Sequence, residues 1–197
     1  PLGMHVAPAP SPVTAANTLD ELLAYCVEAE MGFNMLGEML NADLGSVDGV
    51  SSRTEVITGV DGNDLNLYIH TPDEVDGPMP CVVHTHGGGM AILKASNPNY
   101  VRWRDDLAAT GMVVIGVEFR NSAGELGPHP FPAGLNDCAS AARWAVANSE
   151  ALGISKVVMS GESGGGNLAI ATALKAKQDG WIDDIAGVYA QCPYIYG

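Results

Sequence analysis

The sequence predicts an α/β fold in which a doubly wound, mostly parallel sheet carries helices on both faces. Continuous apolar runs occupy residues 81–86 and 112–119, and such runs are typical of parallel strands that are buried on both sides. Helix-forming stretches separate these runs, so strands and helices alternate along the chain. Repeated units of this kind join through right-handed crossovers, which places helices on both faces of one sheet.

The first 50 residues are predicted to lie outside this sheet. Residues 1–16 are interpreted as a loose Pro- and Ala-rich tail that begins with the remnant of a cleaved expression tag. The run Thr18-Leu19-Asp20-Glu21 is a capping-box pattern, which predicts a helix from there to about Leu40. We therefore divide the chain into this tail, an N-terminal helical segment over residues 17–50 and a sheet-bearing part over residues 51–197.

The remaining elements follow from hydrophobic periodicity and turn residues. Residues 53–71 alternate around Asp61-Gly62, which predicts a hairpin. The others are, in chain order, a strand at 81–86, a crossover helix at Asn99–Thr110, a strand at 112–119, a helix at Ala133–Ser149 with Trp144 and Val146 facing inward, a strand through Val157-Val158, a helix after Ser163 and a strand at Ile185–Cys192. The last strand is apolar on both faces, so we expect further strands to cover its edge.

A sharp turn is predicted after the strand through Val157-Val158, where the sequence reads Gly161-Glu162-Ser163-Gly164-Gly165. This is the G-x-S-x-G pattern of a nucleophile elbow, in which glycines leave room for the turn and the serine projects above the sheet. Gly164 opens the next helix, so its backbone N–H is free to hold an oxyanion. Glu162 is interpreted as a brace for the turn, because neighbouring side chains in a tight turn diverge.

A second glycine motif, His86-Gly87-Gly88-Gly89, ends the strand at 81–86. Without Cβ atoms the loop backbone can approach a substrate and point N–H groups at it. His86 and Gly87 are predicted to brace the loop, and Gly88 and Gly89 to supply oxyanion donors. A flexible turn and a phosphate-cradling nest are the alternatives, although a P-loop also needs a Gly-Lys-Ser/Thr ending, which follows neither glycine cluster.

From about Leu19 to its end, the chain resembles the N-terminal part of hormone-sensitive-lipase-like α/β-hydrolases. The stretches HTHGGGM, Arg120-Asn121, His129–Pro132, GESGGGNLAIAT and YAQCPYIYG carry this resemblance. It implies a serine carboxylesterase that hydrolyses carboxylic esters through an acyl-enzyme and needs no cofactor. The implied site residues are Ser163 as nucleophile and Gly88, Gly89 and Gly164 as oxyanion donors.

The predicted N-terminal helix is rich in methionine. In the family that the chain resembles, N-terminal helices form part of a cap over the active site, and Met side chains adapt to varied ligands. Phe33, Met35 and Met39 are therefore candidates for the lining of an acyl pocket. Plain packing of this helix onto the body of the protein is an equally good interpretation.

The resemblance implies that the acid and the histidine of the triad lie beyond this chain. On this fold both follow the nucleophile. After Ser163 the sequence offers Asp179, Asp183 and Asp184 as acids but no histidine, because all five histidines precede Ser163. We therefore expect both groups, with the remaining strands, to come from a segment beyond Gly197, and this chain alone to be inactive. The alternative is a catalytically silent ligand-binding protein of the gibberellin-receptor type, which keeps the pocket and lacks the histidine.

The composition narrows the class of partner. The sequence has 23 Asp and Glu against 9 Lys and Arg, which argues against nucleic acid or an anionic membrane surface. Four cysteines lie far apart, which favours free thiols over a disulfide framework or a metal site: Cys26, Cys81, Cys138 and Cys192. No apolar run approaches the roughly 20 residues of a membrane span. We expect a cytoplasmic protein whose partners are a small-molecule ester and its own C-terminal segment, with no metal.

Overall fold

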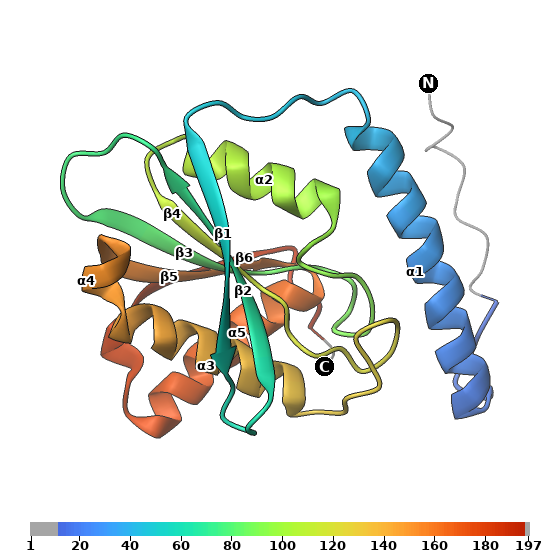
Figure 1. Cartoon of the computed structure of the whole chain (residues 1–197). Helices are drawn as coiled ribbons and strands as arrows, with labels where there is room; N and C mark the ends of the chain where they lie inside the picture. Colours follow the sequence, from blue (N-terminus) through green and yellow to red (C-terminus); the bar gives the residue numbers. More distant parts are fainter. Residues whose placement is uncertain (1–11, 196–197) are drawn as a thin grey trace.

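The computed structural model describes residues 12–195, which form a six-stranded sheet in the order β1-β2-β4-β3-β5-β6 (Figure 1). Residues 1–11 of the expected tail lie outside the described part of the chain. The elements are α1 (Leu19–Asn41), β1 (Val50–Thr58), β2 (Asp64–Pro72), β3 (Met79–Thr85), α2 (Pro98–Ala108), β4 (Val113–Val117), α3 (Ala133–Ala147), α4 (Ser149–Leu152), β5 (Ile154–Glu162), α5 (Gly164–Asp179), η1 (Ile182–Asp184) and β6 (Ile185–Gln191). The predicted fold class is confirmed.

Strands β1 and β2 form the antiparallel margin of the sheet. They make the predicted hairpin, in which Thr58 pairs with Asp64, and β2 continues antiparallel to β4. The other neighbours, β4 with β3, β3 with β5 and β5 with β6, are all parallel. The sheet is therefore mixed, with four parallel strands that carry the apolar runs seen in the sequence.

Helices cover both faces of these parallel strands. Helix α2 lies on one side, against β2 and β4, whereas α3 and α5 lie on the other (Figure 1). Every residue of β4 is buried, as the continuous apolar run predicts for a strand that is covered on both faces. Trp144 and Val146 of α3 pack against the core but are only partly buried.

Helix α1 begins at the predicted capping box. The Thr18 hydroxyl accepts a hydrogen bond from the Glu21 N–H, and the Glu21 carboxylate accepts one from the Thr18 N–H. This 23-residue helix runs beside the sheet and contacts α2 (Figure 1). Its apolar residues are mostly exposed, and its one buried residue is Glu30.

Strands β3 and β5 set the position of the candidate site. They are parallel neighbours in the middle of the sheet, and their register pairs His84 with Ser160 and Thr85 with Gly161. The chain leaves β3 toward β4 on one side and later returns as β5 on the other, so the strand order reverses between them. Ligands of open α/β sheets bind at such a point, outside the carboxyl ends of the strands. The register therefore brings His86–Gly89 beside Glu162–Gly164.

Strand β6 lies at the margin of the sheet opposite β1. Among residues 12–195 its sheet neighbour is β5 alone. The side chains of Val188 and Tyr189 are exposed there. The expected covering strands have no counterpart among the described residues.

Candidate active site

Ser163 occupies the turn between β5 and α5. Its backbone angles are φ 53° and ψ −117°, a combination that costs a non-glycine residue energy and is typical of functional turns. Backbone hydrogen bonds hold it on both sides: its N–H donates to the Gln191 carbonyl at 3.0 Å, and its carbonyl accepts from the Tyr194 N–H at 2.8 Å. A Cβ on Gly165 would collide with the Thr85 carbonyl. The serine is thus fixed in a strained turn that only a small neighbour permits.

The glycine loop after β3 lies against this turn. A Cβ on Gly164 would come within 2.7 Å of both the Gly89 and the Met90 nitrogen, so the backbones of the two motifs are in contact. Gly88, Gly89 and Met90 all have positive φ, at 99°, 65° and 62°. At Gly88 a side chain would also strike the Ile92 carbonyl. The loop therefore folds back sharply beside Ser163.

Three backbone N–H groups next to the serine are unused. Among the hydrogen bonds of residues 12–195, none is donated by the N–H of Gly88, Gly89 or Gly164. Gly164 is the first residue of α5, where the helix dipole also favours a negative charge. Oxyanion holes are built from free backbone donors of this kind.

His86 fixes the orientation of the loop backbone. It is fully buried, it stacks on Phe119 with ring centroids 4.2 Å apart, and its Nδ1 lies 2.7 Å from the Gly87 carbonyl oxygen. Because a carbonyl only accepts, Nδ1 carries the proton and donates it. The Gly87 carbonyl and the Gly88 N–H belong to one trans peptide and point in opposite directions, so this bond turns the Gly88 N–H away from His86. Burial lowers the pKa of His86 to about 4, so the ring is neutral at pH 7.

Glu162 joins the two motifs. One carboxylate oxygen accepts from the Gly87 N–H at 2.5 Å, and the other accepts from Nε2 of His84 at 2.8 Å. Burial alone would raise the pKa of Glu162, but the hydrogen bond and charge of His84 and the Gly87 N–H outweigh it and hold the pKa below its ordinary value. Both carboxylate oxygens are thus engaged by His84 and the Gly87 N–H, so Glu162 braces the loop.

A cavity of about 540 Å³ opens in front of Ser163 and the glycine loop. Phe33, Leu36 and Leu40 of α1 form one wall, and Leu93 lies on the loop side. Its size falls in the usual range of ligand pockets, roughly 300–1,000 Å³. The described site thus combines a serine in a strained turn, free backbone donors and an apolar compartment.

Met35 and Met39 do not join Phe33 in the lining of this cavity. Both are strongly exposed, at 64% and 71%. The reason is helical geometry, because positions 33, 36, 37 and 40 share one side of α1, whereas 35 and 39 lie more than a quarter turn away from Phe33. The methionine content of the helix suggested Met35 and Met39 as lining residues, whereas the helical period places Leu36 and Leu40 on the side of Phe33.

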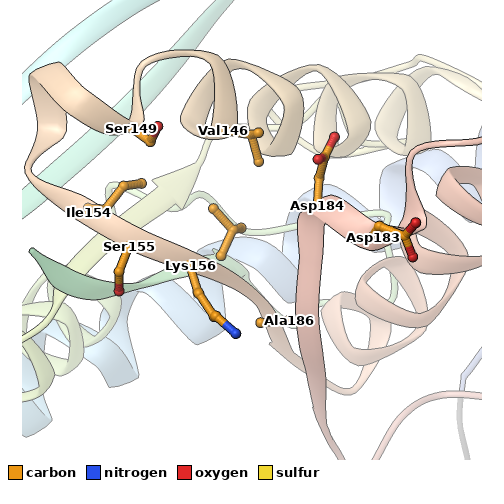
Figure 2. Close-up of a pocket in the computed structure, with 9 residues that line it drawn as sticks. Val146, Ser149, Ile154, Ser155, Lys156, Asp183, Asp184 and Ala186 are labelled. Carbon is orange, nitrogen blue, oxygen red and sulfur yellow. The ribbon is translucent and has the colours of Figure 1, made fainter.

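A different cavity lies at the other end of β5. Lys156, Asp183, Asp184 and Ala186 line it near the amino ends of β5 and β6 (Figure 2). Ser163 follows the carboxyl end of β5, so this polar cavity is remote from the serine. Over residues 12–195 there is also no group of three His, Cys, Asp or Glu side chains that could hold a metal ion.

The described histidines are engaged elsewhere. His70 pairs with Asp105 at 2.6 Å, His84 with Glu162 and His86 with the Gly87 carbonyl, whereas His129 is exposed. None of these four is hydrogen-bonded to Ser163. His5 lies outside the described residues.

The sequence analysis missed two groups of the site. Tyr100 and Leu93 line the cavity from the segment after the glycine loop, and Glu30 reaches that segment from α1. No local pattern marks them, because each acts through a tertiary contact. Glu30 alone has a weak local signal, because a glutamate flanked by apolar residues in a helix can have a buried partner.

A comparison with protein-family models identifies the fold of this chain. A family model described as the alpha/beta hydrolase fold matches residues 82–196, the stretch that holds both glycine motifs. Among the described residues, no helix combines the length and the apolar character needed to cross a bilayer.

Solved structures and curated proteins also show similarity to this chain. The chain is similar to brefeldin A esterase, described as a bacterial homologue of human hormone-sensitive lipase, at 48% identity and a TM-score of 0.89 over 95% of this chain and 52% of that one. It is 31% identical over 163 residues to the chloroplastic tuliposide A-converting enzyme 2 of Tulipa gesneriana, covering 75% of this chain and 40% of the relative. It is 32% identical over 130 residues to carboxylesterase NlhH of Mycobacterium tuberculosis, covering 64% and 39%. The chain spans about half the length of these relatives or less.

Proposed function

Because the chain belongs to the hormone-sensitive-lipase-like family of α/β-hydrolases, we propose that it is the nucleophile-bearing part of a serine carboxylesterase. The observation that carries this proposal is the contact between the strained Ser163 turn and a loop with unused N–H groups. The names of several relatives, which are esterases, support the same reaction class. The apolar cavity next to the serine supports an ester with an apolar acyl chain.

The proposed reaction proceeds through an acyl-enzyme. Ser163 Oγ forms a bond to the ester carbonyl carbon while its proton passes to a histidine, and the carbonyl oxygen becomes an oxyanion held by the N–H groups of Gly88, Gly89 and Gly164. The bond from the carbonyl carbon to the alcohol oxygen then breaks, and the alcohol leaves with the histidine's proton. Water repeats the sequence on the acyl-enzyme and releases the carboxylic acid.

We infer that the histidine and its acid come from a segment of the polypeptide beyond Gly197. The four described histidines have other partners or lie exposed, and β6 has a free margin where a further strand can pair. In the relatives, the compared region also covers only part of the protein. The catalytic unit proposed here is therefore this chain together with that segment.

A fluorophosphonate probe tests the proposal directly, because it reacts covalently only with an activated serine. In the polypeptide that extends beyond Gly197, we expect labelling at Ser163, found by peptide mass spectrometry, and none in Ser163→Ala. Residues 12–195 alone should label far more slowly, because they lack the base.

The alternative, a silent ligand-binding protein on the same scaffold, is supported by the finding that no histidine among residues 12–195 is hydrogen-bonded to Ser163. It predicts that the extended polypeptide binds an apolar carboxylic ligand in the cavity and remains unlabelled. Absence of labelling together with saturable ligand binding would replace the esterase proposal with this one.

A further inference from the structure

A single charged side chain attaches α1 to the wall of the candidate active site. Glu30 is 4% exposed and is the one buried residue of this 23-residue helix. Its Oε1 accepts from the Leu93 N–H at 2.6 Å, and its Oε2 accepts from the Glu125 N–H at 2.7 Å. A buried carboxylate needs such partners, and hydrogen bonds to a charged acceptor are among the stronger ones in proteins.

The two donors belong to the segments that shape the cavity. Leu93 lines the cavity and has φ 74°, an unusual left-handed conformation for a leucine. Its carbonyl accepts from Nδ2 of Asn121 at 2.8 Å, so it is held from both ends. Gly124, which precedes Glu125, has φ 63°. A Cβ at this position would lie only 2.5 Å from Glu30 Oε2. Glu30 therefore links α1, the exit of the glycine loop and residues 121–125.

The polar contacts of α1 lie along one stripe of the helix. Asn34, one turn after Glu30, accepts a hydrogen bond from Nδ2 of Asn97, which also lines the cavity. Phe33, Leu36 and Leu40 form the neighbouring stripe and face the cavity. The same rotation of the helix that satisfies Glu30 thus turns these three apolar side chains toward Ser163.

We propose that Glu30 is a positioning residue that sets the outer wall of the acyl cavity, so that it controls the preference for long acyl chains. The inference rests on the proposed esterase function, and it goes beyond it by naming what selects the substrate. A short acyl group reaches the serine without touching the α1 wall, whereas a long one contacts it. Loss of the Glu30 bonds therefore weakens binding in proportion to chain length.

The kinetic test compares Glu30→Gln with Glu28→Gln, an exposed glutamate on the same helix, in the polypeptide that extends beyond Gly197. The glutamine keeps the size of the side chain, but its NH₂ group cannot accept from an N–H. For p-nitrophenyl octanoate we expect KM to rise about tenfold in Glu30→Gln, with kcat changed less than about threefold. For the acetate ester KM should change less than about twofold, and Glu28→Gln should match the wild type. Equal losses on both esters, or no loss on either, would overturn the proposal.

Amide hydrogen exchange supplies a readout that does not need activity. In the wild type the N–H groups of Leu93 and Glu125 should be protected, and in Glu30→Gln they should exchange at least about tenfold faster while β3 and β5 keep their protection. Unprotected amides in the wild type would overturn the proposal even if the variant failed to fold. If the wild type hydrolyses no ester, the proposed function fails, whereas the exchange data still decide whether Glu30 holds the wall.

Discussion

The nucleophile turn with its glycine loop and the helix α1 face the same cavity but are held in opposite ways. Backbone contacts fix the turn and the loop, where a Cβ on Gly164 would come within 2.7 Å of the Gly89 nitrogen. Helix α1, in contrast, has one buried residue, Glu30, whose side chain is hydrogen-bonded to the body of the protein. The difference teaches that the proposed reacting groups are placed by backbone geometry, whereas the proposed substrate compartment is shaped by side chains.

Replacement of the nucleophile should produce the largest effect. In the extended polypeptide, Ser163→Ala should lower kcat/KM for p-nitrophenyl acetate at least about a thousandfold, because the covalent route is lost. The melting temperature should not fall, since the smaller side chain keeps the turn. Retention of a tenth of wild-type turnover would show that Ser163 is not the nucleophile and would remove the basis of the comparison.

Disruption of the contact between the two glycine motifs should have the second-largest effect on turnover. Gly164→Ala should lower kcat about a hundredfold, because the new methyl group pushes the Gly89 backbone away and misplaces the oxyanion donors. The matched control is Gly32→Ala in α1, where a Cβ meets nothing within 4 Å. This change should leave kcat unaltered and raise stability by up to about 1 kcal/mol through helix propensity. Similar kinetics for the two variants would contradict the distinction between the regions.

The buried imidazole of the glycine loop should make the fold sensitive to acid. Burial lowers the pKa of His86 from 6.5 to about 4, so between these values the unfolded chain binds a proton that the folded chain does not. The free energy of unfolding should therefore fall as the pH drops from 6.5 to 4, by on the order of 3 kcal/mol from this group. Urea unfolding at several pH values should show a shallower slope for His86→Asn. Glu162, whose pKa is lowered, adds a further loss only below its ordinary pKa of 4.5.

Side chains of α1 should give the smallest effects, confined to the substrate. Phe33→Ala should raise KM for p-nitrophenyl octanoate roughly fivefold, since it removes part of an apolar wall. Met35→Ala should leave KM unchanged, because Met35 points away from the cavity. Kinetics with the acetate ester should not distinguish the two. A larger effect of Met35 would mean that α1 is rotated relative to its position here.

The sequence predicts the turn and the glycine loop better than it predicts the position of helix α1. Glycine spacing and buried strands are local signals. The sequence therefore predicts the fold class, the hairpin, α1 and the place of Ser163 after β5. The meeting of the two motifs also depends on the register of β3 and β5, which pairs Thr85 with Gly161. The residues that line the cavity were harder to predict from the sequence. Methionine content suggested Met35 and Met39, whereas the rotation of α1 is set by Glu30, whose partners lie 63 and 95 residues away.

The reliance on backbone amides has a consequence for mutational robustness. Every amino acid except proline supplies an N–H, so a point substitution at Gly88, Gly89 or Gly164 can misdirect a donor but rarely deletes it. In directed evolution, libraries over these positions would sample mostly dead variants that differ in geometry alone. Libraries over positions 33, 36 and 40 would sample different compartments around intact chemistry. Under the proposed function, the scaffold thus separates a reaction centre built from backbone groups from a side-chain surface on which new substrate ranges can evolve.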